Sequence, residues 1–225
     1  TDIFKAKNLD KIISRFKPDY ILHLASYSSV AFSWKEPSAS FANNTNIFLN
    51  VLDTGRQLGL PTRILSVGSS EQYGNVKAKD IPLKENQSLQ PISPYAVARV
   101  AQEMITKVYV DGYGLDIIMT RSFNHIGPYQ KDIFVVPSLV RQLVEIKKYP
   151  KNKNSITAGN LSIVRDFTDV RDVVSAYHQL FKKGKSGEVY NVCSGRGGAL
   201  KDIVNTLCGK LDIKVKINTS PQLIR

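Results

Sequence analysis

Residues 63–74 of this chain read RILSVGSSEQYG. The first half is a short apolar run, which is typical of a buried strand. The second half changes at once to glycine, serine and glutamate. Ligands of parallel α/β sheets lie at the carboxyl ends of the strands, which is where such polar residues are needed. This stretch therefore predicts an α/β protein with a functional site where the strand ends.

The remainder of the chain alternates short apolar runs with longer amphipathic stretches. Strands are expected over residues 20–25, 63–67, 115–120, 155–158, 188–192 and 214–218. Helices are expected over residues 7–16, 37–58, 94–113, 136–147, 170–183 and 200–211. Strands that alternate with helices imply a parallel sheet with right-handed crossovers. The first strand, residues 20–25, is expected to be a buried parallel strand.

The composition excludes several classes of protein. Of the 225 residues, 42% are apolar and 22% are charged, as in an ordinary globular protein. No stretch approaches the roughly 18–20 uninterrupted apolar residues of a membrane helix, and the start has no signal-peptide pattern. The two cysteines lack a CxxC spacing, and the three histidines lack partners at metal-ligand spacing. We therefore expect a cytoplasmic protein with reduced thiols, no membrane contact and no metal.

The net charge of +12, from 31 lysines and arginines against 19 acidic residues, raises the question of nucleic acid. The lysines are spread over expected helix faces and loops, and no zinc-finger or RNA-binding signature accompanies them. We therefore expect no nucleic-acid partner. A positive surface also suits an anionic small substrate such as a nucleotide diphosphate. Charge alone does not separate a solvated basic surface from such a site.

Tyr95 and Arg99 are the first candidates for chemistry. Pro94 predicts the start of their helix, because a missing amide hydrogen costs nothing at the first helical position. Positions i and i+4 of a helix share one face, so the two side-chain ends lie together. A fixed cation stabilises the phenolate form of tyrosine, which can exchange a proton with a sugar while a nicotinamide moves a hydride. By itself, this spacing favours an ordinary contact between two side chains on a helix surface. The surrounding sequence decides between that interpretation and a catalytic pair.

That context comes from three segments at expected strand ends, His23–Ser26, Gly68–Gly74 and Arg121–Pro128. In this order, with Tyr95 and Arg99, they resemble the extended short-chain dehydrogenase/reductase family. That family has an HLAA-type strand end, an S/T-S-E-x-Y-G segment, a Y-x-x-x-K motif and a phosphate-contacting asparagine. The resemblance covers nearly the whole chain. The segments most similar to GDP-6-deoxy-D-mannose reductases, with GDP-mannose 4,6-dehydratases next, are residues 28–30, 121–130, 159–161, 165–172 and 187–195.

The resemblance implies roles for four residues at the reacting centre. Ser69 matches the family's catalytic serine or threonine, and Tyr95 matches its acid/base residue. Arg99 stands where the family has lysine. Glu71 matches the carboxylate that dehydratases use as a base during elimination, and a solvated loop acid is the alternative reading. Ser69 and Glu71 are also implied to contact the substrate.

The resemblance also implies where the cofactor, NADP or NAD, and the substrate bind. Asn124 and Arg165 match positions that hold the nucleotide diphosphate of the substrate, because an amide and a bidentate cation suit phosphate. For His125, a hydrogen-bonded structural histidine is the alternative to a cofactor contact. The implied cofactor-lining residues are Asp2, Ile3, Leu24, Ala25, Ser28, Tyr95, Arg99 and His125.

Two departures from the family pattern matter. Arginine at position 99 is a broad planar fork where lysine is a compact donor, so the cofactor ribose is expected to bind less well. The glycine-rich turn that places pyrophosphate at a helix N-terminus is absent. We therefore expect a fragment of a Rossmann-like doubly wound parallel sheet that lacks its first strands. Residues 1–130 would form the partial dinucleotide-binding domain. Residues 131–225 would combine part of a small C-terminal substrate domain with a returning strand and helix.

Three functions remain open at this point. The leading hypothesis is NAD(P)H-dependent reduction of the 4-keto group of GDP-4-dehydro-6-deoxy-D-mannose to GDP-D-rhamnose. The first alternative is GDP-mannose 4,6-dehydratase activity with Glu71 as the base. The second is a non-catalytic nucleotide-sugar-binding fragment, which Arg99 and the missing glycine turn favour. The expected partner is a GDP-sugar, and a homodimer through a bundle of the helices at 37–58 and 94–113 is a family-level expectation.

Overall fold

The computed structural model describes residues 2–150 and 154–223. The chain forms two compact units, and neither is one continuous segment. The first comprises Thr1–Phe123 with Val173–Val192, and the second comprises Asn124–Asp172 with Cys193–Arg225. The chain therefore passes between the units three times. The first crossing precedes the expected boundary at residue 130, because the segment that starts at Asn124 pairs with a strand of the second unit.

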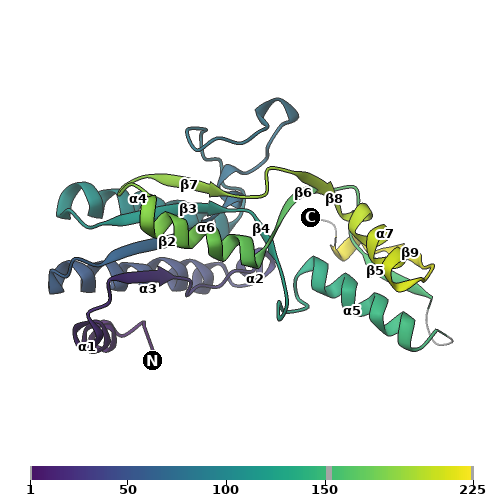
Figure 1. Ribbon diagram of the computed structural model, residues 1–225, viewed down its shortest axis with the longest axis horizontal. Helices are drawn as coiled ribbons and strands as arrows, with labels where there is room; N and C mark the ends of the chain where they lie inside the picture. The colour runs from purple at the N-terminus through teal and green to yellow at the C-terminus, as the bar shows by residue number, and fades with distance from the viewer. Residues whose placement is uncertain (1, 151–153, 224–225) are drawn as a thin grey trace. The chain divides into compact units, whose positions relative to one another are not determined.

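A four-stranded parallel sheet forms the centre of the first unit (Figure 1). Each pair of neighbours is parallel, and each connection between them contains at least one helix. The order across the sheet is β1 (Tyr20–His23), β2 (Arg63–Ser69), β3 (Ile117–Ser122) and β7 (Val189–Val192). The predicted Rossmann-like α/β class is confirmed.

Helices cover both faces of this sheet because its strands alternate apolar side chains between the two faces. Ile64 of β2 belongs to a buried cluster with side chains of three helices, whereas Leu65 belongs to a second cluster on the other side. The three helices of the first cluster are α1 (Ala6–Phe16), α3 (Pro37–Leu58) and α4 (Pro94–Tyr113). Val173 and Tyr177 of α6 (Val170–Lys183) contribute to the second cluster. The sheet is therefore doubly wound.

Helix α4, which carries Tyr95, begins and ends at sequence-coded caps. Pro94 is its first residue, and the Ser93 hydroxyl accepts a 3.1 Å hydrogen bond from the amide of Ala96. Gly114 ends the helix in the left-handed conformation, with φ of 69°, which glycine adopts without steric cost. Both ends of the predicted helix are confirmed.

Strand β1 differs from the prediction of a fully buried strand. Tyr20 and Leu22 are 55% and 38% exposed, although His23 is buried. Among the described residues β1 is an edge strand. Of the strands in this sheet, only β2 and β7 contribute side chains to the buried cluster that includes α6. The face of β1 that carries Tyr20 and Leu22 therefore remains open to solvent over much of its area.

The second unit contains two small sheets. Strand β4 (Asn124–Ile126) pairs in parallel with β6 (Val164–Asp169), and β6 pairs antiparallel with β8 (Gly197–Ala199). The other sheet pairs β5 (Ser155–Ala158) with β9 (Lys216–Thr219) in parallel. Strands β4, β6 and β8 were not predicted, because two of them have only three residues and β6 has three charged side chains.

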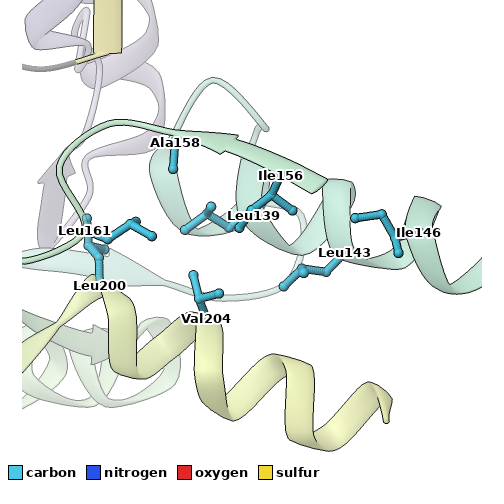
Figure 2. Packing of buried hydrophobic residues seen from close by; sticks show 8 residues of the cluster. All are labelled: Leu139, Leu143, Ile146, Ile156, Ala158, Leu161, Leu200 and Val204. Carbon is cyan, nitrogen blue, oxygen red and sulfur yellow. The ribbon is translucent and has the colours of Figure 1, made fainter. Parts of the chain in front are cut away.

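A separate hydrophobic core stabilises the second unit. Helix α5 (Val135–Lys148) and helix α7 (Leu200–Leu211) pack with β5 around it, and their side chains point toward one another (Figure 2). The buried residues are Leu139, Leu143, Ile146, Ile156, Ala158, Leu161, Leu200 and Val204. The remaining short helices of the chain are α2 (Val30–Lys35), η1 (Ser70–Tyr73), η2 (Ala78–Asp80) and η3 (Pro221–Leu223).

Candidate active site

The carboxyl ends of β1, β2 and β3 meet at one edge of the first sheet, because the strands are adjacent and parallel. In the sheet register His23 stands opposite Ser66, and Ser69 stands opposite Ser122. The segments that leave these strands carry most of the predicted site residues. This edge is where the fold class places its ligands.

Ser69 is fixed at the junction of β2 and η1. Its hydroxyl accepts a 3.2 Å hydrogen bond from the amide of Glu71, and its own amide donates to Gln72 Oε1 at 3.0 Å. The preceding Gly68 lies so close to β3 that a Cβ atom there would stand 2.4 Å from the carbonyl oxygen of Thr120. Glycine at this position therefore lets the end of β2 approach its neighbour and sets the place of Ser69.

A buried ion pair connects the Ser69 segment to helix α4 and strand β3. Glu103 Oε2 accepts from Gln72 Nε2 at 2.7 Å and from Arg121 Nε at 3.0 Å, while Glu103 Oε1 accepts from Arg121 Nη2 at 2.6 Å. The side chains of Arg121 and Glu103 are only 5% and 10% exposed. Charge-assisted bidentate pairs are strong and geometrically specific. The pair therefore holds Ser69 and the Tyr95 helix in one fixed arrangement.

Tyr73 extends this network on the other side of Arg121. Its hydroxyl accepts from Arg121 Nη1 at 3.0 Å and donates to Asn191 Oδ1 at 2.8 Å. Burial raises the pKa of Tyr73, and the hydrogen bond from Arg121 opposes that rise. Tyr73 is thus a neutral phenol with a structural role.

Tyr95 and Arg99 lie together on α4, as the i, i+4 spacing predicts. Both are buried, and the guanidinium carbon of Arg99 lies 5.1 Å from the centre of the Tyr95 ring. A cation in this position over a tyrosine ring is attracted by the negative face of the ring.

The guanidinium of Arg99 is held by three acceptors. Nη1 donates to the carbonyl oxygen of Val67 at 3.0 Å and to Gln102 Oε1 at 2.7 Å. Nη2 donates to Ser26 Oγ at 2.5 Å. These contacts tie the end of β2 and the segment after β1 to helix α4. The side chain is therefore anchored inside the first unit.

His23 is buried beside this cation. Its pKa is lowered from 6.5 to about 4 by burial, and secondly by the charge of Arg99. Its ring centre lies 4.9 Å from that of Phe48. His23 is therefore neutral at pH 7 and packs in the core.

Three of the predicted cofactor-lining residues come together at a hollow of about 230 Å³ in the first unit. Asp2, Ile3 and Ala25 all line it. The carbonyl oxygen of Ile3 accepts from Asn50 Nδ2 at 3.0 Å, which fixes this segment to α3. The lining is mainly apolar and aromatic with one carboxylate, a surface that suits the adenosine portion of NAD(P); its other members are Phe4, Ser26, Tyr27, Asn43 and Ile47.

The other cofactor candidates of the first unit lie outside this lining. Leu24 and Ser28 are exposed residues of the segment between β1 and α2. The buried Asn44 fixes the segment, because its Oδ1 accepts from the amide of Tyr27 at 2.8 Å and its Nδ2 donates to the Tyr27 carbonyl at 3.0 Å. Leu24 and Ser28 therefore stand on an anchored segment at the ligand edge.

Glu71 is a site candidate of the first unit whose carboxylate is uncommitted among the described residues. It is partly buried at the start of η1, and its carboxylate makes no hydrogen bond or ion pair with any residue in the described ranges. A carboxylate next to Ser69 that is not bound to a cation is available as a base.

Three predicted residues belong to the second unit. Asn124 on β4 donates through Nδ2 to the carbonyl oxygen of Asp166 at 3.0 Å, and the exposed Arg165 lies on the neighbouring strand β6. The pKa of His125 is lowered by burial, and its carbonyl accepts from Gln130 Nε2 at 2.9 Å. The structure thus brings Asn124 and Arg165 onto adjacent strands of one small sheet.

Sequence reasoning assigned no role to Ser26, Gln102 or Glu103, although each holds a site residue in place. Gln102 stands three residues after Arg99 on the same helix, a spacing at which side chains meet. That spacing could have identified it. Ser26 contacts Arg99 from 73 residues away in the chain, and no local pattern indicates such a contact.

Over residues 2–150 and 154–223 no helix is both long and apolar enough to span a bilayer. The same part of the chain holds no group of three or more histidine, cysteine or acidic side chains placed to bind a metal ion.

Known proteins share this arrangement. A family model described as GDP-mannose 4,6 dehydratase matches residues 1–223. A match of this extent, on a doubly wound parallel sheet, defines the class as the extended short-chain dehydrogenase/reductases, NAD(P)-dependent oxidoreductases and dehydratases. Within that class, the chain belongs to the GDP-mannose 4,6-dehydratase family.

Individual relatives give the same result. The chain is 33% identical over 208 residues to the GDP-6-deoxy-D-mannose reductase of Pseudomonas aeruginosa, covering 92% of this chain and 68% of the reductase. It is 27% identical over 217 residues to the GDP-mannose 4,6-dehydratase of Vibrio cholerae, covering 96% of this chain and 57% of the dehydratase. The solved structure of RMD from Pseudomonas aeruginosa, complexed with NADPH, superposes with a TM-score of 0.93 at 32% identity. That match covers 100% of this chain and 76% of the solved one. The chain thus spans between about half and three quarters of these relatives.

Proposed function

We propose that this protein reduces the 4-keto group of a nucleotide sugar with NAD(P)H, converting GDP-4-dehydro-6-deoxy-D-mannose to GDP-D-rhamnose. The observation that carries the proposal is the buried pair of Tyr95 and Arg99, held beside the end of β2 where Ser69 stands. The 33% identity to a GDP-6-deoxy-D-mannose reductase supports the choice of reaction.

Three residues of the first unit contribute to this chemistry. NAD(P)H, when bound, supplies the hydride that is added to C4 of the sugar. Tyr95 gives a proton to the oxygen at C4, so that the carbonyl becomes a hydroxyl. The Ser69 hydroxyl donates a hydrogen bond to the same oxygen and fixes its position. Arg99 stabilises the phenolate that Tyr95 leaves behind.

Binding residues are proposed for each unit separately. Asp2, Ile3 and Ala25 at the hollow hold the adenosine portion of the cofactor, with Leu24 and Ser28 of the neighbouring segment. In the second unit, Asn124 and Arg165 hold the diphosphate of the substrate, and His125 contacts the cofactor.

The test is a direct assay of the complete protein. The keto sugar is mixed with NADPH or with NADH, absorbance at 340 nm is followed, and the product is identified by NMR. We expect oxidation of one or both cofactors with formation of GDP-D-rhamnose. The proposal is wrong if neither cofactor is consumed while the protein is folded and binds nucleotide sugar. That result would favour a binding protein without turnover.

A dehydratase is the second candidate, because the Glu71 carboxylate has no described partner and stands next to Ser69. This activity would convert GDP-mannose to the 4-keto-6-deoxy sugar without net loss of cofactor. It would be abolished by Glu71→Gln, whereas reduction of the keto sugar would continue in that variant. The same pair of assays therefore separates the two reactions.

We further propose a homodimer formed by α3 and α4. The exposed residues Val97, Met104 and Val108 follow one stripe of α4, and Trp34 and Phe41 are exposed nearby, at a groove of about 750 Å³ that Val97 also lines. Helices with such a stripe pack against other helices. Met104→Glu is expected to turn a dimer into a monomer in sedimentation, whereas Val174→Glu, at an exposed valine of α6, should not. A monomeric unchanged protein contradicts this proposal.

The cellular compartment follows from the proposed reaction. NAD(P)H and GDP-sugars are cytoplasmic metabolites, so we propose that the enzyme works in the cytoplasm. Cell fractionation with an antibody against the complete protein tests this placement.

A further inference from the structure

Gln102 has no part in the proposed reaction, yet it is hydrogen-bonded to the cation beside Tyr95. We propose that Gln102, together with Ser26, is a positioning residue that fixes the Arg99 guanidinium against Tyr95 while leaving its positive charge unneutralised. The inference deepens the proposed function, because it rests on Tyr95 as the proton donor.

The receptor for the guanidinium is made of neutral groups only. A guanidinium carries five N–H donors in one plane and matches several acceptors at once. Here the acceptors are the Val67 carbonyl, the Gln102 amide oxygen and the Ser26 hydroxyl, at 3.0, 2.7 and 2.5 Å. They hold Arg99 in one orientation and contribute no negative charge.

The nearest carboxylate along the helix is committed elsewhere. Glu103 follows Gln102 directly, but both of its carboxylate oxygens bind Arg121, and one also binds Gln72. The charge of Arg99 therefore has no counter-ion among its hydrogen-bond partners in the described chain. Since few solvent dipoles screen a buried charge, it acts strongly on neighbouring groups. The pKa of His23 is lowered first by burial and second by the positive charge of Arg99, so this charge also acts on His23.

The two halves of the Gln102 amide allow a sharp test. Its Oε1 holds Arg99, whereas its Nε2 is buried and has no hydrogen-bond partner within the described ranges. Gln102→Glu therefore keeps the acceptor, loses no hydrogen bond and places a negative charge 2.7 Å from the guanidinium. Gln102→Glu therefore changes the charge beside Arg99 while the guanidinium is still held, so the two roles of Gln102 are tested separately.

The experiment compares Gln102→Glu and Gln102→Leu in the complete protein. Gln102→Glu should keep the thermal midpoint and the NADPH affinity of the unchanged protein. Its kcat should fall at least tenfold, with the KM for the keto sugar unchanged. Gln102→Leu should lower both kcat and the thermal midpoint. Gln179→Glu, on the exposed face of α6, adds the same charge as a control and should change none of these quantities.

A structural role alone would leave kcat of Gln102→Glu unchanged, and that result overturns the proposal. So does a Gln102→Glu protein that loses kcat and thermal midpoint together.

A second readout does not depend on any sugar. Crystal structures of the unchanged protein and of both Gln102 variants show where the Arg99 guanidinium lies. It should keep its place against Tyr95 in Gln102→Glu and leave that place in Gln102→Leu. If these positions are found but the keto sugar is not reduced, the proposed function fails and the positioning role stands. If the guanidinium keeps its place in Gln102→Leu, the positioning role is wrong.

Discussion

Glu103 and Arg121 form two hydrogen bonds, of 2.6 and 3.0 Å, in a part of the first unit where both side chains are almost fully buried. The pair joins helix α4 to strand β3. Glu103 also accepts a hydrogen bond from Gln72, whose side-chain oxygen accepts one from the Ser69 amide. One ion pair therefore sets the relative positions of the two proposed catalytic groups, Ser69 and Tyr95.

Removal of one partner of this pair should be costly. In Glu103→Ala the guanidinium of Arg121 stays buried without its counter-ion, so we expect a loss of about 3–5 kcal/mol in the free energy of unfolding. Urea denaturation measures the loss. Asp53→Ala breaks the exposed pair of Asp53 and Arg56 and should change stability little. Equal effects of the two substitutions would contradict a structural role for the buried pair.

His23 should make stability depend on pH. Its pKa is about 4 in the folded protein and 6.5 in the unfolded chain, so the unfolded chain binds the proton first as pH falls. The stabilisation is complete above pH 6.5 and is lost as pH falls toward 4. Between pH 7 and pH 5 the loss is about 2 kcal/mol. The measurement is the free energy of unfolding at the two pH values.

The control for this prediction is a comparison of two histidines. His23→Asn should have a shallower loss of stability between pH 7 and pH 5 than the unchanged protein. His178→Asn, at an exposed position of α6, should retain the full loss. A His23→Asn protein with the same pH dependence as the unchanged protein would show that the prediction is wrong.

Arg99→Lys restores the family's usual residue but should destabilise this chain. A single compact ammonium does not span Ser26, Gln102 and the Val67 carbonyl together as the guanidinium does, so at least one buried acceptor loses its donor. We expect a loss of about 1–3 kcal/mol in the free energy of unfolding. Lys107→Arg, at an exposed site of the same helix, is the matched control and should be neutral. An Arg99→Lys protein as stable as the unchanged one would contradict the anchoring described above.

Tyr95→Phe should remove the proton donor but keep the ring under the guanidinium. We expect kcat for the keto sugar to fall about 10²–10⁴-fold, with little change in nucleotide-sugar binding measured by calorimetry. Tyr113→Phe, which alters an exposed tyrosine at the end of the same helix, should have full activity. A Tyr95→Phe protein with normal kcat would exclude Tyr95 as the acid.

Gly68→Ala tests the close approach of β2 to β3. The new Cβ atom would stand 2.4 Å from the Thr120 carbonyl and 2.6 Å from Gln72 Oε1, so strands or side chains must shift. We expect a loss of about 1–3 kcal/mol or more, together with reduced activity because Ser69 is the next residue. Gly112→Ala, on α4 with no atom within 4 Å of the new Cβ, should be tolerated. Unfolding curves measure the loss of stability and the reductase assay measures the loss of activity in both variants. Equal results for Gly68→Ala and Gly112→Ala would contradict the prediction.

Much of the fold could be predicted because the chain marks the ends of its elements. Helices α3, α4, α6 and α7 and strand β5 begin and end at the expected residues. Proline at the first position and glycine in the left-handed conformation mark the ends of α3 and α4. Strand β6 was missed, because its sequence VRDFTD has neither the apolar run nor the alternation that identifies a strand.

The candidate site was predictable only where its contacts are local. The contact of Arg99 with Tyr95 follows from helix spacing. Its bonds to Ser26 and Val67 join residues 73 and 32 positions apart, which only the folded sheet brings together. The family resemblance indicated which residues matter. It did not indicate that an arginine at position 99 would be bound by a glutamine three residues further on.

Each compact unit is assembled from two separate stretches of chain. A chimera that exchanged the second unit for that of a relative would need two grafts, over residues 124–172 and 193–225, and three new junctions. One of these junctions falls within α6, just before Val173. A single recombination event would instead leave at least one unit with segments from two parents. New substrate preferences should therefore arise in this architecture more readily by point substitution than by exchange of cassettes.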